Sequence, residues 1–209
     1  MTEPDGPRAA VAGAARRLAA GGLLVGTAGN VSARVGDAVW ATASGVVLAE
    51  CGADDVVRVG DGTGTPTSEI DLHLGVYADT GAGAVVHTHA PWSTAVACVL
   101  PELPVLHYQQ LLLGGAIRVA PYATFGTPAL ARHVREALAG RQAALMANHG
   151  SVAIGATLDK AVENAFLLEW LAALHARASA LGAPRFLTEE EQTDVITQAL
   201  TRGYGEKQP

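Results

Sequence analysis

Three of the seven histidines in the chain have the spacing of metal ligands. His87 and His89 lie two residues apart in the apolar run GAVVHTH (83–89), which has the composition of a buried strand. Residues two apart on a strand project from the same face, so both imidazoles can reach one ion. His149 ends a second apolar run and is a third candidate. Three neutral ligands leave one coordination position of a zinc ion open, as in catalytic zinc sites. The competing interpretation is that these histidines only pack in the core or lie at the surface.

One carboxylate stands where it could work beside such a metal. Glu69 follows Thr67 and Ser68 at the start of a predicted helix. A carboxylate at that place can act as a general base next to a Lewis acid, or it can simply complement the helix dipole at the surface. His73, one turn later, is expected to be a core histidine, with support of Glu69 or metal ligation as alternatives.

Three short polar clusters could hold an anion through hydroxyl and amide groups. They are the segment 26–30 (GTAGN), the pair Ser44 and Gly45, and the pair Thr67 and Ser68. The third cluster lies at a predicted helix N-terminus, where anions are favoured. None of them matches the GxGxxG or GxxxxGK[ST] pattern, so a nucleotide phosphate loop is not indicated. Taken singly, each cluster is equally typical of a turn.

The charge pattern excludes several other classes of function. The chain has 14 Lys and Arg against 20 Asp and Glu, a net charge of −6, with no basic block that would favour nucleic acid or an anionic membrane. Only two lysines exist, Lys160 and Lys207, which leaves little scope for Schiff-base chemistry. No apolar run reaches the roughly 18 residues of a membrane span. Two cysteines without a CxxC motif favour a reducing compartment, so we expect a cytoplasmic protein.

The N-terminal segment allows two interpretations. Arg16 and Arg17 precede an apolar stretch, as they would in a twin-arginine export signal. The same segment also fits an amphipathic helix with Val11, Ala14 and Leu18 facing inward and both arginines facing outward. We expect the helix, because export processing would cut close to the polar segment 26–34.

These candidate residues must be positioned by a sheet with helices around it. Residues 30–35 and 38–42 predict a hairpin, and the further predicted strands are 54–59, 83–89, 116–120, 143–149 and 151–156. Helix-start residues predict helices that begin at about Thr67, Pro91, Thr127 and Thr157. A capping box of Thr188 with Glu191 predicts the start of the last helix. We therefore expect one α/β domain over residues 1–209, with a mixed, mostly antiparallel central sheet covered by helices on both faces.

Read in order, these pieces resemble the class II aldolase/adducin family, with the aldolase branch the nearest. The matching stretches are GTAGNVSAR (26–34), TASGV (42–46), TSE (67–69), VVHTHA (85–90), HY (107–108), APYATFGT (120–127), NHG (148–150) and YG (204–205). The resemblance extends from about Arg16 to Gly205, nearly the whole chain. The sequence departs from the family pattern at several positions. Ser44 stands in place of Thr and Thr67 in place of Ser, so both keep a hydroxyl group, and Ile70 stands in place of an aromatic residue.

The resemblance implies a role for each matched position. His87, His89 and His149 match zinc ligands, and Glu69 matches the carboxylate that binds the free metal or acts as acid and base. Tyr108 matches a tyrosine that a neighbouring subunit contributes to handle the proton of the aldehyde oxygen. The positions that match the phosphate-binding site are Asn30, Ser44, Gly45, Thr67 and Ser68. Phe125 and Tyr204 match the aldehyde-binding side, between subunits of a homotetramer.

The implied activity is cleavage of a ketose 1-phosphate to dihydroxyacetone phosphate and a short aldehyde. L-fuculose 1-phosphate and a 5-deoxypentulose 1-phosphate are both candidate substrates. The same family resemblance leaves open a pentulose-phosphate 4-epimerase, a methylthioribulose-phosphate dehydratase, and a non-catalytic adducin-like binding module. The presence of Glu69 rather than Asp favours the aldolase over the epimerase, and intact histidines disfavour the binding module.

Overall fold

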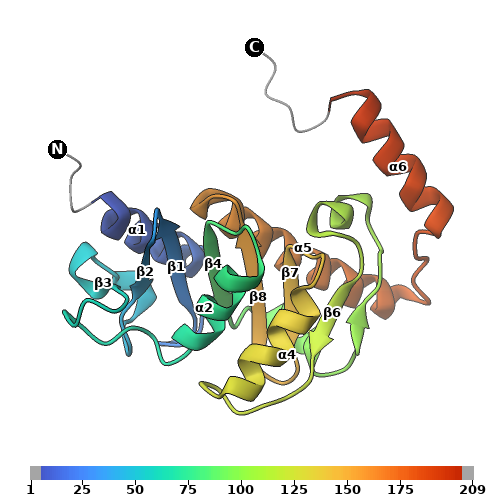
Figure 1. Cartoon of the computed structure of the whole chain (residues 1–209). Coiled ribbons are helices and arrows are strands. Elements are labelled where there is room, and N and C mark those ends of the chain that lie inside the picture. The colour runs from blue at the N-terminus through green and yellow to red at the C-terminus, as the bar shows by residue number, and fades with distance from the viewer. Residues whose placement is uncertain (1–5, 204–209) are drawn as a thin grey trace.

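The chain forms an α/β domain in which a central sheet lies between two layers of helices (Figure 1). The structure, a computed structural model, describes residues 6–203. The strands are β1 (Asn30–Val35), β2 (Ala38–Thr42), β3 (Val56–Arg58), β4 (Ala84–Thr88), β5 (Glu102–Leu103), β6 (Ile117–Ala120), β7 (Ala143–Met146) and β8 (Gly150–Gly155). The helices are α1 (Gly6–Ala20), α2 (Ile70–Asp79), α3 (Pro91–Ala97), α4 (Pro128–Leu138), α5 (Leu158–Leu181) and α6 (Glu189–Thr201), with 3-10 turns η1 (Leu48–Glu50), η2 (Ala53–Asp55) and η3 (Tyr108–Leu113).

The sheet has the strand order β3-β2-β1-β4-β8-β7-β6-β5. All neighbouring strands are antiparallel except β6 and β7, which run parallel. The mixed, mostly antiparallel sheet expected from the sequence is therefore confirmed. Strand β4, which carries His87, lies between the hairpin of β1 and β2 and the hairpin of β7 and β8. It can therefore combine residues from both halves of the sheet.

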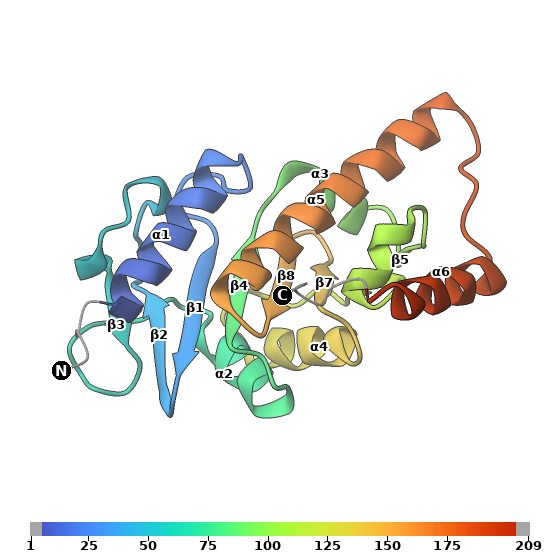
Figure 2. The same ribbon diagram turned by 90° about the horizontal axis from the view of Figure 1, so that it is seen from above.

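Alternating side chains of the central strands pack into two separate apolar cores. On β4, Val86 belongs to the core that α1, α3 and α5 cover, whereas Val85 belongs to the core that α2 and α4 cover. On β8, Ala153 and Val152 divide between the two cores in the same way. Figure 2 shows α1 and α5 on one side of the sheet and α2 and α4 on the other. Coverage by helices on both faces is thus also confirmed.

Helix α1 has the amphipathic pattern expected of it. Val11, Ala14 and Leu18 are buried against the sheet, and Arg16 and Arg17 are exposed. The helical interpretation of this segment is therefore confirmed. No helix among residues 6–203 is both long enough and apolar enough to cross a membrane.

Helix α2 begins later than the sequence predicts. The Thr67 hydroxyl accepts the backbone N–H of Glu69 at 3.3 Å and makes a turn ahead of the helix, so the first helical residue is Ile70. Glu69 thereby becomes the N-cap residue, with φ −100° and ψ 19°. Its side chain is left at the open end of the helix, beside the sheet.

Strand β7 ends earlier than predicted, at Met146 instead of His149. Asn148 has a φ of 55°, in the left-handed region that a strand cannot contain. Helix α3, which the sequence predicts to run from Pro91 to about Leu100, ends at Ala97. Both differences are changes of boundary and leave the order of elements intact.

Helix α6 is held differently from the other helices. Its capping box is formed as predicted: the Thr188 hydroxyl accepts the N–H of Glu191, and the Glu191 carboxylate accepts the N–H of Thr188. None of its side chains is buried, and it contacts only the region of η3 closely. In Figure 1 it stands apart from the two helical layers.

Candidate active site

The three candidate histidines come together at one end of β4. The ring centroids of His87, His89 and His149 lie 4.8 to 4.9 Å apart, and their ligand nitrogens all lie within 4.8 Å of one another. The Nε2 atoms of His87 and His89 face each other at 2.9 Å. His87 is fully buried, and the other two are partly exposed toward a cleft. The end of β4 and the turn between β7 and β8, which are far apart in sequence, thus supply one nitrogen cluster.

The orientation of His87 is fixed from behind. Its Nδ1–H donates to the backbone carbonyl of Ser151 on the neighbouring strand at 2.9 Å. The proton on Nδ1 leaves a lone pair on Nε2, which is the tautomer that a metal ligand needs. The pairing of β4 with β8 therefore orients the ring.

The turn between β7 and β8 places His149. The backbone N–H of His149 donates to Met146 O at 3.1 Å, and Asn148, which is in the left-handed conformation, reverses the chain just before it. Gly150 then packs against β4 so closely that a Cβ would lie 2.2 Å from Thr88 O. A glycine is required at this position because the backbones of the two strands approach so closely.

Glu69 reaches the histidine cluster from the start of α2. Its Oε2 lies 3.1 Å from His87 Nε2 and accepts a hydrogen bond from Asn30 Nδ2 at 3.1 Å. Its Oε1 lies 3.7 Å from His149 Nε2 and is buried without a hydrogen-bond partner among the described residues. Buried carboxylate oxygens ordinarily have a partner. This orphaned oxygen faces the space that the imidazoles share.

The acid–base properties of the cluster follow from burial and mutual contact. Burial alone would raise the Glu69 pKa, but His87 and the Asn30 hydrogen bond outweigh it and lower the pKa. Burial alone would lower the His87 pKa, but the Glu69 carboxylate outweighs it and raises the pKa. Burial and the neighbouring imidazoles lower the pKa of His89 to about 4 and also lower that of His149. Glu69 is thus ionised at neutral pH, and His89 and His149 are neutral.

These residues fit a divalent metal ion. His87, His89 and His149 present three nitrogens to one space, and the unpartnered Oε1 of Glu69 faces the same space. Imidazole nitrogen and carboxylate oxygen are the donor set of zinc and related ions. Three histidine ligands would leave further coordination positions of the ion open to the cleft.

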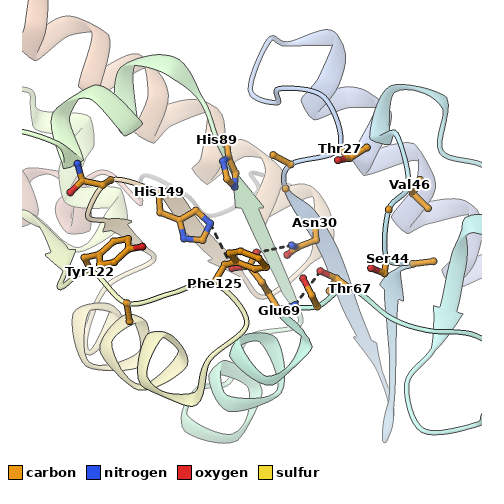
Figure 3. Close-up of a pocket in the computed structure, with 17 residues that line it drawn as sticks. Thr27, Asn30, Ser44, Val46, Thr67, Glu69, His89, Tyr122, Phe125 and His149 are labelled. Atoms are coloured by element: carbon orange, nitrogen blue, oxygen red, sulfur yellow. Dashed lines mark hydrogen bonds and ion pairs between the residues drawn. The ribbon is translucent and has the colours of Figure 1, made fainter.

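A cleft of about 500 Å³ opens in front of the cluster (Figure 3). Gly29 lets its lining loop pass beside β4, since a Cβ there would lie 2.9 Å from His87 O. The residues expected to bind phosphate all line the cleft: Asn30, Ser44, Gly45, Thr67 and Ser68. None of the described residues that line it is Lys or Arg. Any anion in the cleft would therefore meet hydroxyl and amide groups.

One side of the cleft carries aromatic side chains, among them one of the two residues expected at the aldehyde-binding side. Phe125 lines the cleft, and so do Tyr122 and Asn148, which the sequence reasoning missed. Phe125 and Tyr122 are exposed by 66% and 64%, respectively. Tyr122 lies three residues before Phe125 in the segment APYATFGT (120–127), which resembles the family, and this was the signal available in the sequence. In Figure 3, Tyr122 lies on the side of the cleft away from Ser44, and the Phe125 ring lies between them, overlapping Glu69 in this view.

The structure does not bring Tyr108 into this cleft. Tyr108 is 53% exposed at the start of η3, where it borders a shallow groove with α6. Tyr204 lies outside the described residues. The expected roles of Tyr108 and Tyr204 therefore stay predictions.

Comparison with known proteins assigns the family. Residues 9–176 match the family described as "Class II Aldolase and Adducin N-terminal domain", so the chain belongs to this family. It is 39% identical over 203 residues to the 5-methylthioribulose-1-phosphate/5-deoxyribulose-1-phosphate aldolase of Rhodospirillum rubrum, covering 94% of this chain and 92% of that one. It is 38% identical over 192 residues to an L-fuculose phosphate aldolase of Escherichia coli, covering 88% of each.

A solved structure gives the same assignment. The fold matches an L-fuculose 1-phosphate aldolase with a TM-score of 0.88 and 31% identity, covering 95% of this chain and 97% of that one. The chain is therefore an aldolase, an enzyme of the lyase class. Its three-histidine group is compatible with the divalent metal of a class II enzyme.

Proposed function

We propose that the enzyme uses zinc to cleave a ketose 1-phosphate reversibly into dihydroxyacetone phosphate and a short aldehyde. The observation that carries this proposal is the arrangement of one cleft: a three-histidine cluster, a buried carboxylate and an uncharged polar lining with four Ser and Thr side chains. A metal centre that is adjacent to an anion-binding lining suits a phosphorylated sugar. The Rhodospirillum and Escherichia relatives are both named for such substrates.

The chemistry divides between the metal and the residues of the cleft. Zinc held by His87, His89 and His149 would supply a Lewis acid that stabilises the negative charge left on the nucleophilic fragment. Cleavage breaks the C3–C4 bond, removes a proton from the C4 hydroxyl and delivers one to C3. Glu69 would handle the proton at C3, and Tyr108 of a neighbouring subunit would handle the proton at the C4 oxygen.

The phosphate would lie at the Ser44 end of the cleft. Thr27, Ser44, Thr67 and Ser68 offer hydroxyl groups there, and Gly45 has no side chain to obstruct an approach to the backbone. The aldehyde half would lie toward Tyr122 and Phe125. Their exposed, largely apolar rings suit the short apolar end of a 5-deoxypentulose 1-phosphate or of L-fuculose 1-phosphate.

In this proposal the enzyme is a cytoplasmic homotetramer, and its active sites lie between subunits. The position of Tyr108, outside the cleft of its own chain and half exposed, supports a role in the site of a neighbouring copy. Membrane and nucleic-acid partners have no part in the proposal, and the substrate is a small sugar phosphate.

The direct test is release of dihydroxyacetone phosphate from several ketose 1-phosphates by the zinc-loaded enzyme. We expect the 5-deoxyribulose, 5-methylthioribulose or L-fuculose ester to yield dihydroxyacetone phosphate and aldehyde in equal amounts. A C4 epimer or a dehydrated product without aldehyde would contradict the proposal and favour another reaction of the family. No turnover together with no binding of added Zn²⁺ would favour a non-catalytic binding module.

The role of Glu69 has its own test. Glu69→Gln keeps the shape but removes the base, so kcat should fall by roughly 10²–10⁴ while the zinc content stays normal. Glu163→Gln, an exposed carboxylate on α5, is the matched control and should behave as wild type. Normal turnover by Glu69→Gln would show that the acid–base assignment is wrong.

A further inference from the structure

A chain of buried hydrogen bonds extends from Glu69 through the space between α2 and the sheet. Asn30 Nδ2 contacts Glu69 Oε2 at 3.1 Å, and Asn30 Oδ1 contacts His73 Nε2 at 2.6 Å. The other ring nitrogen of His73 contacts Ser32 Oγ at 2.7 Å, and Ser32 Oγ contacts Tyr77 Oη at 2.7 Å. All five residues are buried, and His73 is completely so. The last three residues do not line the cleft.

The alternation of elements produces this chain. Asn30 and Ser32 are two apart on β1 and therefore face the α2 side of the sheet together. His73 and Tyr77 are four apart on α2 and lie on one face of the helix. The register of β1 against β4 sets Asn30 opposite His87, which brings the end of the chain to the metal cluster.

The hydrogen bonds of this chain can point in only one direction. An ionised carboxylate only accepts, so Asn30 must turn its amide NH₂ toward Glu69 and its carbonyl toward His73. His73 must then donate from Nε2 and accept at Nδ1 from the Ser32 hydroxyl. Since the single Ser32 proton is used there, Tyr77 donates to Ser32 Oγ. Each donor thus points along the chain toward the carboxylate, and successive bonds polarise one another.

The electrostatics of the chain support this direction. Burial lowers the pKa of His73 to about 3, so the imidazole is neutral and has a single N–H to place. Burial raises the pKa of Tyr77 to about 12, so its hydroxyl keeps its proton. Both groups therefore remain in the protonation state that the direction requires throughout the neutral range.

We propose that His73, fixed as the Nε2–H tautomer by Ser32 and Tyr77, is a positioning residue that keeps the Asn30 amide turned toward Glu69. This inference rests on the proposed role of Glu69 in proton transfer. Without the His73 donor, the Asn30 amide could rotate and present its carbonyl to the carboxylate, which would repel it. Because an amide does not pass protons on, the chain orients Glu69 and is no proton wire.

The first experiment needs no activity. The imidazole ¹⁵N shifts of the zinc-loaded enzyme report which ring nitrogen of His73 carries the proton, with assignment by comparison with His73→Gln. We expect protonation at Nε2 and none at Nδ1. The Nδ1–H tautomer or a doubly protonated ring would overturn the proposal.

The second experiment shortens the chain from its far end. Tyr77→Phe and Ser32→Ala remove hydrogen-bonding groups that do not line the cleft, and kcat per bound zinc should fall about three- to tenfold with little change in KM. Asn164→Leu is the matched control. Asn164 is a buried polar residue of α5, on the other side of the sheet from α2, and its amide donates to Ile154 O. It should lose stability without loss of kcat.

The third experiment exchanges His73 itself. His73→Phe should lower kcat roughly 10–100-fold, and His73→Gln, which keeps a donor for Asn30, should restore most of that loss. If Glu69→Gln is impaired while Ser32→Ala, Tyr77→Phe and His73→Phe all retain wild-type kcat, this inference fails and the proposed function stands. If Glu69→Gln is itself fully active, the proposed function fails instead.

Discussion

The two ends of the cleft are built in opposite ways. At the proposed metal end, His87 and Glu69 are exposed by 0% and 7%; Ser151 of β8 fixes His87 Nδ1, and Asn30 of β1 fixes Glu69 Oε2. At the end where we propose that the aldehyde half lies, Phe125 and Tyr122 are exposed by 66% and 64% on the loop ahead of α4. The interior of one chain thus makes the metal end almost complete, whereas the aldehyde end is an open rim.

The two ends of the cleft meet two different requirements of the enzyme, the handling of charge and the binding of a short apolar fragment. Groups that handle charge need fixed positions and low solvent access, which the sheet provides. Groups that contact a short apolar fragment need shape alone, and an open rim can be completed by a neighbouring molecule. The comparison can be tested by substitutions at the metal end, in its supporting backbone and at the rim, in order of decreasing effect.

Removal of a metal ligand should have the largest effect. His89→Ala should lose bound zinc and lower kcat by about a thousandfold or more, since a Lewis acid contributes several kcal/mol to stabilising the transition state. Zinc content by elemental analysis and kcat on the same sample check the result. His175→Ala, on α5 away from the cleft, is the control. Retained activity with retained zinc would break the assignment of the metal end.

Substitution in the supporting backbone should have an intermediate effect. The Cβ of Gly150→Ala would lie 2.2 Å from Thr88 O, and neither backbone can move without separating β4 from β8. We expect a loss of about 3 kcal/mol in the free energy of unfolding, together with weaker zinc binding. Denaturant unfolding measures the first. Gly13→Ala, in the interior of α1 where a Cβ meets nothing within 4 Å, should stabilise the protein by about 0.5–1 kcal/mol, and equal stability of the two variants would contradict this account.

Substitution at the rim should have the smallest effect. Phe125→Ala removes an exposed ring that makes part of one wall of the cleft, so kcat/KM should fall by no more than about tenfold and Tm should not change. The effect should differ between substrates with different aldehyde halves. Leu181→Ala, at an exposed site remote from the cleft, is the control. A large fall in Tm would show that the rim is not an open surface.

Local patterns were sufficient to predict most of the fold. Continuous apolar runs predicted strands such as β4 and β8, because both faces of these strands pack against apolar cores, and helical patterning predicted the main helices. Motif order identified the family, and the spacing of His87 and His89 indicated that they share a face. Chain patterning of this kind is informative wherever burial alone decides the structure.

The features that were missed depend either on a single local turn or on contacts between distant segments. The start of α2 at Ile70 depends on a hydroxyl of Thr67, and the end of β7 depends on a left-handed Asn148. Tyr122 lines the cleft only because the loop ahead of α4 returns to the sheet. His73 was expected in the core and is buried there, but its partners come from β1, some 40 residues earlier in the chain. Sequence distance conceals contacts of this kind.

The open rim also bears on how such an enzyme can diversify. Side chains that bury little area contribute little to the folding free energy, so replacements at Tyr122 and Phe125 require no compensating change elsewhere. The fixed metal end can then be inherited unchanged while the rim varies. Relatives with 38% and 39% identity to this chain are named for different sugar phosphates, a difference that this division of labour would accommodate.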